Sequence, residues 1–262
     1  MENPIFPIPA FSDNYIWAFT DEQQRHACVV DPGDAAPVLS FLDKNDLQLS
    51  HILITHHHPD HTGGVEALAR RFNARVFGPQ NSPYGGIEQQ LAEKDELTVL
   101  GFDFSVLQIP GHTLDHIAYY CERPPGRHRP LVFCGDTLFA AGCGRIFEGN
   151  PQMMYDSLQK LARLPADTEI YCTHEYTLAN LTFAAAADPH NQALKERTAA
   201  ARKAREQQQP TLPSHLALEL ATNPFLRCTE EPLADSAASH VGADLSEPVE
   251  VFAALRRWKD TF

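Results

Sequence analysis

The 262-residue sequence lacks the features that mark exported or membrane proteins. Its apolar runs are all far shorter than the roughly 20 residues that a membrane-spanning helix requires. The N-terminal stretch has neither the basic region nor the unbroken apolar region of a signal peptide. We therefore expect a cytoplasmic protein that does not bind membranes.

Paired cysteines and a serine-nucleophile motif are also missing. The six cysteines, at positions 28, 121, 134, 143, 172 and 228, include no C-x-x-C pair. Without an export signal they are expected to be reduced thiols rather than a disulfide framework. No G-x-S-x-G sequence occurs, which disfavours serine-dependent hydrolysis. Any metal ion must therefore be held by groups other than cysteine.

Basic residues are scarce relative to acidic ones. The 21 lysines and arginines face 34 aspartates and glutamates, which gives a formal net charge of −13. This charge argues against nonspecific binding of nucleic acid, which relies on a basic face. It also means that a small anionic substrate would need a local basic patch on an acidic protein.

The sequence changes character near residue 150. Before it, short strand-like runs alternate with turns and helices in an α/β pattern. We predict strands at 16–20, 27–31, 51–55, 74–78, 97–109, 116–121 and 131–139, and helices at 35–46 and 64–72. Helical composition then dominates at 153–164, 178–209, 211–226 and 249–262. The pattern favours a strand-rich body of ~170 residues followed by a helical part, both within the usual size range of domains.

The densest group of metal-binding residue types lies in ITHHHPDHTGG, residues 54–64. Side chains alternate along extended backbone, so His56 and His58 point to one side and His57 to the other. Asp60 and His61 follow a proline and can face the same site from another direction. We therefore interpret His57 as solvated or bonded outside the ligand set.

Further candidate ligands follow apolar, strand-like runs. They are His112, Asp136 and His174, at positions where an open α/β sheet presents functional residues. Five histidines and two aspartates are too many for one tetrahedral site and suit two ions that share a bridging carboxylate. Nitrogen and oxygen ligands favour zinc, iron or manganese. We expect two divalent ions per chain. Zn²⁺ is the preferred ion, and iron or manganese are the alternatives.

Some neighbouring residues are assigned supporting roles. Asp115 and His116 flank the His112 turn and can act as hydrogen-bonding partners of the ligands. Cys134 and Cys172 lie in the strand-like runs before Asp136 and His174, and we expect them to fill buried positions.

The segment THHHPDH, residues 55–61, resembles the T-H-x-H-x-D-H signature of the metallo-β-lactamase superfamily. GHT (111–113), CGDTLF (134–139) and THEYT (173–177) fit the same superfamily in the expected order. The resemblance implies a four-layer αβ/βα sandwich with a metal centre at one edge of two sheets. The signature alone does not choose a reaction.

More specific segments are similar to the glyoxalase II (hydroxyacylglutathione hydrolase) family. They are SDNYIW (12–17), AGCGRIFEG (141–149), THEYTLANLTFA (173–184), NPFLR (223–227) and RRWKD (256–260). The resemblance covers essentially the whole chain. It implies a metallo-β-lactamase-like catalytic domain over residues 1–172 and a helical, substrate-binding C-terminal domain over residues 173–262.

The implied reaction is hydrolysis of S-2-hydroxyacylglutathione thioesters by a metal-bridging hydroxide, as the second step of methylglyoxal detoxification. S-D-lactoylglutathione would give D-lactate and glutathione. Carried over position by position, the resemblance implies that His56, His58 and His112 hold one metal ion. Asp60, His61 and His174 hold the other, and Asp136 bridges the two. Asp60 and Asp136 would thus serve catalysis as well as ligation.

The resemblance also implies a glutathione site. Its residues are Arg145, Phe147, Tyr176, Arg256 and Lys259. Some relatives have tyrosine at position 147, so phenylalanine loses a hydrogen bond while keeping the packing contact. By residue type alone, Arg256 and Lys259 would be the solvated basic end of a C-terminal helix. The resemblance instead favours a basic patch that binds the carboxylates of glutathione.

Other activities of the superfamily fit the sequence less well. A β-lactamase should carry an export signal, and a nuclease is disfavoured by the acidic charge. A lactonase and a one-iron persulfide dioxygenase stay open, although the C-terminal segments fit the dioxygenase badly. A metal-binding module without turnover is the alternative outside enzymes. We expect a monomer whose partner is a small glutathione thioester.

Overall fold

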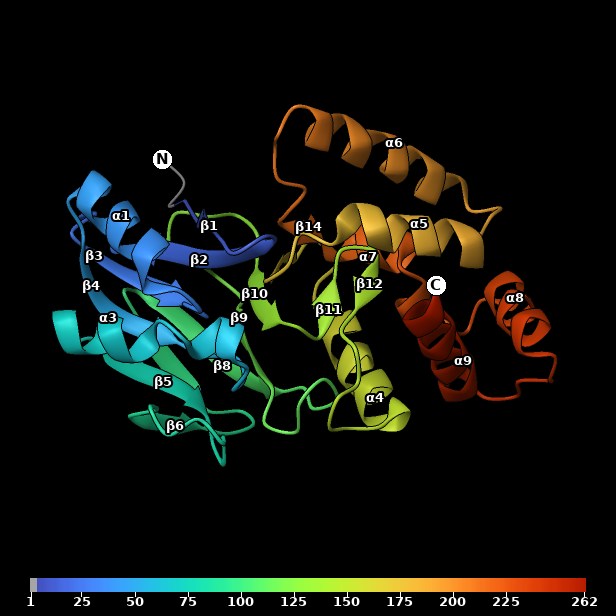
Figure 1. Ribbon diagram of the computed structural model, residues 1–262, viewed down its shortest axis with the longest axis horizontal. Helices are drawn as coiled ribbons and strands as arrows, with labels where there is room; N and C mark the ends of the chain where they lie inside the picture. The colour runs from blue at the N-terminus through green and yellow to red at the C-terminus, as the bar shows by residue number, and fades with distance from the viewer. Residues whose placement is uncertain (1–3) are drawn as a thin grey trace. The chain divides into compact units, whose positions relative to one another are not determined.

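The computed structural model describes residues 4–262, and the chain divides into two compact units (Figure 1). The first comprises residues up to 108 together with 115–135 and 171–174; the second comprises residues 109–114, 136–170 and 175–262. Residues 1–3, part of the stretch on which the expected absence of a signal peptide rests, lie outside the described residues. The domain boundary expected between residues 172 and 173 stays a prediction.

The first sheet of the first unit has the strand order β1-β2-β3-β4-β5-β6. Its strands are β1 (Phe6–Ala10), β2 (Asn14–Thr20), β3 (His26–Val30), β4 (Gln48–Leu53), β5 (Arg75–Pro79) and β6 (Gln89–Leu91). From β3 onward the neighbours are parallel, so each pair needs a long crossover connection. The helices α1 (Ala35–Asn45) and α3 (Val65–Phe72) lie in these crossovers and pack on the sheet (Figure 1).

The second sheet of this unit has the order β13-β10-β9-β8-β7. Its strands are β7 (Glu96–Val99), β8 (Phe102–Gln108), β9 (Ile117–Cys121), β10 (Leu131–Gly135) and β13 (Glu169–Cys172), of which Tyr171 and Cys172 belong to this unit. The single strand predicted over 97–109 is wrong. Leu100 and Gly101 both adopt positive φ angles, 52° and 86°, and this turn divides the segment into β7 and β8.

Aromatic side chains fill the space between the two sheets. The Phe19 ring lies 4.5 Å from Phe102 and 5.9 Å from Phe133, measured between ring centroids. The Trp17 ring lies 4.9 Å from Tyr171, and its Nε1 donates a hydrogen bond to the carbonyl oxygen of Cys172. These buried rings pack β2 of one sheet against β8, β10 and β13 of the other.

The second unit is largely helical. Its helices are α4 (Pro151–Ala162), α5 (Thr177–Ala187), α6 (Gln192–Glu206), α7 (Leu216–Thr222), the 3₁₀ helix η1 (Pro224–Leu226), α8 (Glu231–Val241) and α9 (Pro248–Thr261). The strands β11 (Leu138–Phe139) and β12 (Gly142–Cys143) form a hairpin, and β14 (Ser214–His215) pairs with the start of β13.

The helix ends follow from local sequence. The predicted helical run 178–209 is two helices, because the chain breaks at 188–191 and the Asn191 side chain accepts a hydrogen bond from Leu194 N at the start of α6. Glu247 and Glu250 form a capping box at the start of α9, with Pro248 in the first turn. α8, between residues 227 and 248, was not predicted from the sequence.

The predicted α/β class, with two sheets, helices and a helical C-terminal part, is confirmed. All six cysteines are free and buried, and Cys134 and Cys172 fill buried strand positions as predicted. Within residues 4–262, every helix is too short or too polar to span a bilayer.

Candidate metal centre

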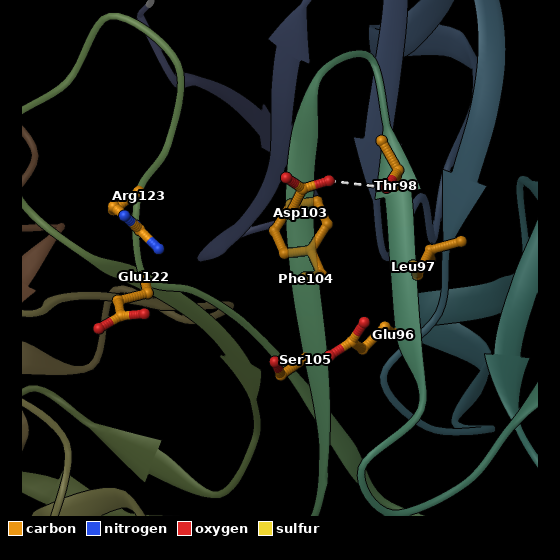
Figure 2. Close-up of a pocket in the computed structure, with 8 residues that line it drawn as sticks. All are labelled: Glu96, Leu97, Thr98, Asp103, Phe104, Ser105, Glu122 and Arg123. Atoms are coloured by element: carbon orange, nitrogen blue, oxygen red, sulfur yellow. Dashed lines mark hydrogen bonds between the residues drawn. The ribbon is translucent and has the colours of Figure 1, made fainter.

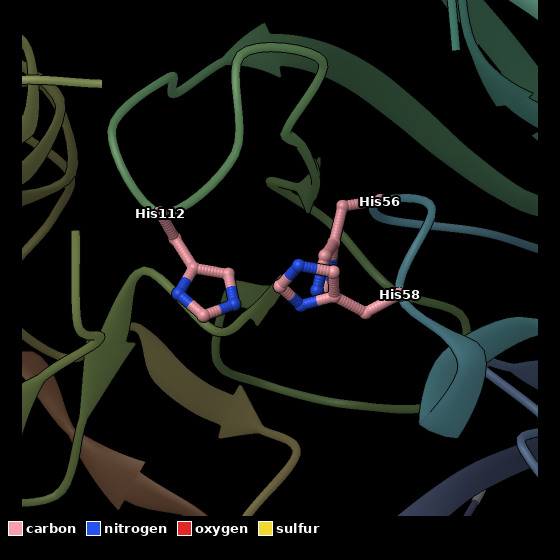
Figure 3. A group of neighbouring side chains, drawn as sticks. All are labelled: His56, His58 and His112. Carbon is pink, nitrogen blue, oxygen red and sulfur yellow. The ribbon is translucent and has the colours of Figure 1, made fainter. Parts of the chain in front are cut away.

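The loop after β4 presents His56 and His58 on the same side. Their ring centroids are 4.7 Å apart, and Figure 3 shows both side chains leaving this one loop. His56 is fully buried, whereas His58 is half-buried at the N-terminal end of the short helix α2 (Pro59–Thr62). The alternation predicted from extended backbone therefore holds for this pair.

α2 and the segment after β13 bring three more candidate ligands together. In the first unit, Asp60 Oδ2 lies 3.5 Å from Nε2 of His61 and 3.5 Å from Nε2 of His174. Ligand atoms of these three residues all lie within 4.8 Å of one another. Residues 60 and 174 are distant in sequence, so the fold of this unit creates the group.

The second unit supplies the remaining pair of predicted ligands. His112 lies in the loop after β8, and Asp136 directly follows β10; Figure 3 shows the position of His112 on its loop. Nε2 of His112 lies 3.5 Å from Oδ2 of Asp136, and both side chains are buried.

Carboxylates orient two of the histidines in the first unit. Asp13 Oδ1 lies 2.8 Å from Nδ1 of His174, and Asp31 Oδ2 lies 3.0 Å from Nδ1 of His61. For His174 the hydrogen-bond acceptor at Nδ1 places the proton on that nitrogen and leaves the lone pair on Nε2, and for His61 the charge of the adjacent Asp31 carboxylate favours the same tautomer. In both rings Nε2 is the nitrogen that faces Asp60.

Asp31 also acts on His56 through Thr55. The Thr55 hydroxyl donates to Asp31 Oδ2 at 2.7 Å and lies 3.1 Å from Nδ1 of His56. Because the hydroxyl proton is directed to Asp31, Oγ1 accepts from His56 Nδ1, which again leaves Nε2 for a ligand. Asp31 has a φ of 53°, a left-handed conformation that aspartate tolerates better than most residues.

His112 follows the same rule in the second unit. Its Nδ1 lies 2.7 Å from the carbonyl oxygen of Arg145, so Nδ1 is the donor and Nε2 faces Asp136. A backbone carbonyl here plays the role that carboxylates play for His61 and His174.

Sequence reasoning missed the residues that orient the ligands. In the sequence, Asp13 and Asn14 stand out only as part of SDNYIW, and Asp31 only as the last residue of the strand predicted over 27–31. Asn14 Nδ2 donates to Asp60 Oδ2 at 3.1 Å. A signal was present for Asp31, which directly follows the apolar strand β3 as the predicted ligands follow theirs, whereas Asp13 and Asn14 stand at the start of β2.

The ligand atoms fit a divalent cation. Two atoms bound to one zinc ion in tetrahedral geometry, at about 2.0–2.2 Å, lie roughly 3.4 Å apart. The separations of 3.5 Å between Asp60 Oδ2 and the two imidazole nitrogens match this value. Neutral imidazoles with defined tautomers, together with carboxylates, form a donor set suited to zinc, iron or manganese.

The neighbouring histidines have other partners. His57 Nδ1 lies 2.9 Å from Asp115 Oδ1, and Asp115 also accepts a hydrogen bond from Ser82. His116 stacks on His56, with ring centroids 4.6 Å apart and an interplanar angle of 15°. His57 therefore has the bond outside the ligand set that the sequence suggested, and His116 supports a ligand by packing.

The predicted glutathione residues near the loops of the second unit are accessible. The Arg145 side chain is 60% exposed, with Nε 3.5 Å from Asp260, and Phe147 is 61% exposed. The Phe147 ring lies 5.3 Å from the His112 ring. Tyr176 precedes α5 and is also exposed.

Arg256 and Lys259 on α9 have different surroundings. Arg256 is only 6% exposed; its Nη1 donates to the carbonyl oxygen of Cys143, and its guanidinium lies over the Phe225 ring. Lys259 Nζ lies 5.5 Å from the centre of the Phe183 ring. Burial, followed by the charge of Arg256, lowers the pKa of Lys259 below its ordinary value. A partly desolvated cation is suited to binding an anion.

A hollow elsewhere in the first unit, over β7 and β8, has another character (Figure 2). Its lining includes Glu96, Asp103 and Glu122, with Arg123 as the basic member, and Asp103 accepts a hydrogen bond from Thr98. The predicted site residues do not line it.

Comparison with known proteins bears on both parts of the chain. Residues 175–262 match the family model described as hydroxyacylglutathione hydrolase C-terminus, and residues 22–174 match that of the metallo-β-lactamase superfamily. The hydroxyacylglutathione hydrolase of Pseudomonas fluorescens (strain SBW25) is 52% identical over 98% of this chain and 99% of its own. That of Nitrosomonas europaea is 51% identical over 98% of this chain and 96% of its own. Among solved structures, ETHE1 from Myxococcus xanthus is similar with a TM-score of 0.65 at 27% identity, over 100% of this chain and 99% of that one.

Proposed function

We propose a function from one premise: the chain belongs to the hydroxyacylglutathione hydrolase family, within the metallo-β-lactamase superfamily. The proposed reaction is hydrolysis of S-2-hydroxyacylglutathione thioesters to glutathione and a 2-hydroxy acid. With S-D-lactoylglutathione the acid is D-lactate, which places the enzyme at the second step of methylglyoxal detoxification.

The observation that carries the proposal is the arrangement of imidazoles around carboxylates. His61 and His174 direct Nε2 at Asp60, and His112 directs Nε2 at Asp136. Such preorientation is typical of metal sites, where a partner at the second ring nitrogen fixes the tautomer. It supports two metal ions per chain, preferably Zn²⁺.

The ligands are assigned to two ions. In our proposal His56, His58 and His112 would hold one, Asp60, His61 and His174 would hold the other, and Asp136 would serve as a ligand of both. When bound, two divalent ions lower the pKa of a shared water toward neutrality and polarise the thioester carbonyl. Asp60 ligates and orients the nucleophile, and Asn14 fixes the Asp60 carboxylate through its hydrogen bond. The leaving thiolate has a solution pKa of roughly 8.5, so it departs without a separate general acid.

The glutathione moiety is assigned to the second unit. Arg145, Arg256 and Lys259 supply positive charge for its carboxylates, and Phe147 and Tyr176 pack against it. This local charge answers the difficulty raised by the net charge of −13, since charge near the site governs the approach of a small anion. A cytoplasmic location and a monomeric state stay predictions from the sequence.

The decisive experiment uses one preparation and three substrates. Purified protein is assayed on S-D-lactoylglutathione, on glutathione persulfide and on a lactone, with metal analysis of the same sample. We expect turnover of the thioester and two metal ions per chain. Preferential oxidation of the persulfide with a single iron would contradict the proposal, and so would full thioesterase activity with less than one metal ion per chain.

A further inference from the structure

The NPFLR segment has no role in the proposed reaction, yet its asparagine contacts the chain between two site residues. The hairpin formed by β11 and β12 joins Asp136 to Arg145, and its residues are buried. A two-stranded hairpin of this length has little stability of its own. What surrounds it therefore determines its position.

Asn223 binds both strands of the hairpin. Its Nδ2 donates to the carbonyl oxygens of Phe139 at 3.1 Å and Gly142 at 2.9 Å. Its Oδ1 accepts from Phe225 N at 3.1 Å at the start of η1. One fully buried side chain thus satisfies buried carbonyls of the hairpin with one end and caps a helix with the other.

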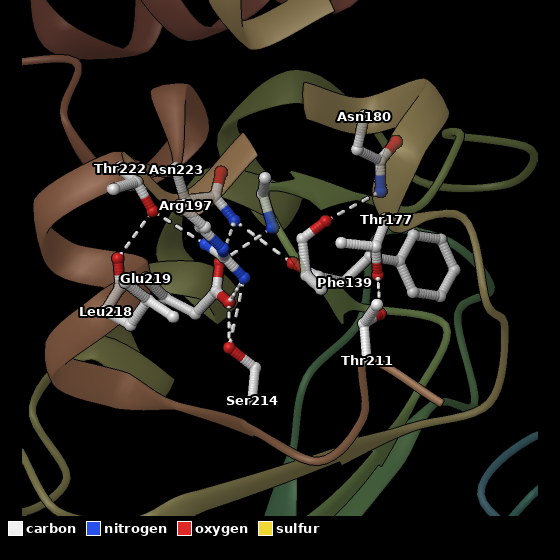
Figure 4. A network of polar contacts seen from close by, with 12 residues as sticks. Phe139, Thr177, Asn180, Arg197, Thr211, Ser214, Leu218, Glu219, Thr222 and Asn223 are labelled. Atoms are coloured by element: carbon white, nitrogen blue, oxygen red, sulfur yellow. Dashed lines mark hydrogen bonds and ion pairs between the residues drawn. The ribbon is translucent and has the colours of Figure 1, made fainter. Parts of the chain in front are cut away.

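The tip of the hairpin is held from two further helices. Asn180 of α5 donates to the carbonyl oxygen of Ala140 at 3.0 Å, and Glu219 of α7 accepts from Ala141 N at 2.8 Å. Ala141 has a φ of 55°, a left-handed conformation that an alanine adopts only under such constraint. Figure 4 shows Asn180, Glu219 and Asn223 together with Phe139 of the hairpin.

The Glu219 carboxylate is itself fixed by a buried cation. Arg197 of α6 donates to Glu219 through Nη2 and to Thr222 Oγ1 through Nη1, and Ser214 Oγ also donates to Glu219 (Figure 4). Because Glu219 and Arg197 are both buried, their charges are compensated and their orientation is restricted. The contact to Ala141 is therefore rigid.

The base of the hairpin touches the ligands of the second unit. Gly144 N donates to Thr137 O, and a Cβ at position 144 would lie 1.9 Å from the carbonyl oxygen of Asp136 and 3.2 Å from His112 Nδ1. The next residue is Arg145, whose carbonyl fixes the His112 tautomer. Movement of the hairpin would consequently shift the backbone of Asp136 and release the imidazole of His112.

We propose that Asn180, Glu219 and Asn223 are positioning residues that hold this hairpin so that His112 and Asp136 keep their metal-binding orientation. The inference rests on the proposed function for the identity of these two ligands. It gives the NPFLR asparagine and the C-terminal helices a role in metal affinity, in addition to the binding of glutathione.

The test compares metal affinity with stability. Zn²⁺ dissociation constants are measured by chelator competition on metal-depleted full-length protein, with melting temperatures before and after loading. N223A is expected to weaken zinc binding by about 10–100-fold, the usual effect of losing a partner that orients a ligand. N223D keeps the oxygen that caps η1 but loses the donors to Phe139, Gly142 and Glu219 Oε2, and it places a second carboxylate beside Glu219, so it should weaken zinc binding as well.

N191A is the matched control. Asn191 caps α6 in the same unit and bonds to Asp188 and Ala221 rather than to the hairpin. This variant should lower the melting temperature but keep the zinc affinity of the wild type. Equal zinc affinity in N223D and N191A would overturn the proposal.

Folding failure and failure of the proposed function are separable. If the variants at position 223 do not fold, N180A decides, because it removes only the bond to Ala140 O; zinc affinity equal to that of N191A would overturn the proposal. Wild-type protein that binds zinc but does not hydrolyse the thioester contradicts the proposed function alone. Wild-type activity combined with unchanged zinc affinity in the variants contradicts the positioning role alone.

Discussion

The Asp13 carboxylate lies 2.8 Å from Nδ1 of His174, although 161 positions separate the two residues. Asp13 immediately precedes β2, and His174 follows β13. The pairing of Tyr15 N with the carbonyl oxygen of Thr173 at 2.7 Å holds the two segments side by side. Strand pairing therefore delivers the carboxylate to the imidazole.

This pair gives the first prediction. D13N keeps the shape of the side chain but removes the charge behind His174, so metal affinity should fall by about tenfold. Chelator competition with Zn²⁺ measures the change. D21N is the control, because Asp21 lies 3.1 Å from Nδ1 of the exposed His26, outside the site. Equal zinc affinity in the two variants would show that the Asp13 charge is unimportant.

The second prediction concerns the ligands themselves. H58A and D136A should abolish thioesterase activity and lower the number of bound metal ions, because each removes a proposed ligand. Elemental analysis and an assay on the same preparation measure both effects. H57A should keep the metal content, since His57 bonds to Asp115. Wild-type metal content in H58A would rule out the proposed ligand set.

The third prediction separates the two basic residues of α9. K259A should raise KM roughly tenfold or more with a smaller change in kcat, because the charge binds a part of the substrate remote from the reacting carbonyl. R256A should also raise KM, and it should lower the melting temperature further, since Arg256 is bonded to Cys143 O and packed on Phe225.

K195A is the control for both, as Lys195 is an exposed residue of α6 in the same unit. Steady-state kinetics and thermal unfolding on all three variants give the comparison. A KM for K259A equal to that of K195A would show that Lys259 is a solvated residue at the end of α9 and does not bind the substrate.

The fourth prediction concerns pH. Burial, with the Arg256 charge as a further cause, lowers the pKa of Lys259 below its ordinary 10.5, so the folded protein loses this proton earlier than the unfolded chain. As pH rises through the lowered pKa, the binding charge disappears and KM should increase. In the window between the lowered pKa and 10.5 the unfolded chain binds more protons, so this group makes stability rise with pH.

K259R distinguishes the lysine from other titrations, because arginine stays charged throughout this range. Its KM should stay flat where that of the wild type rises, after subtraction of uncatalysed thioester hydrolysis. A parallel rise in both proteins would assign the pH dependence to the substrate amine or to another group.

The fifth prediction concerns the exposed ring at position 147. F147Y adds a hydroxyl where some relatives carry one, and a single hydrogen bond of about 0.5–1.5 kcal/mol corresponds to a two- to tenfold lower KM. F262Y is the control, because Phe262 is an equally exposed phenylalanine in the same unit. An unchanged KM in F147Y would limit position 147 to packing.

The sequence predicted the ligands better than their supports. His56, His58, Asp60 and His61 lie within six positions, so local alternation suffices to infer a shared site. Asp13 and Asp31 orient their histidines through pairings of strands that are distant in sequence. A single residue type at a strand end does not reveal such a partner, because the partner depends on which strands are neighbours.

The helices and strands, too, were predicted only in part from the sequence. Hydrophobic periodicity located most strands and helices, yet it merged β7 with β8, β10 with β11 and α5 with α6. Local turn residues mark two of these breaks: Gly101 follows Leu100, which itself adopts a positive φ, and Pro189 lies between α5 and α6. A prediction from hydrophobic runs and helical composition alone passes over such single residues.

The buried cysteines have a consequence for chemical resistance. Burial raises the pKa of the Cys28, Cys143 and Cys228 thiols, and that of Cys121 to about 11. Only a thiolate attacks a thioester efficiently, and these covered groups stay protonated at neutral pH. The buried cysteines are therefore protected from acylation by the thioesters that the protein binds.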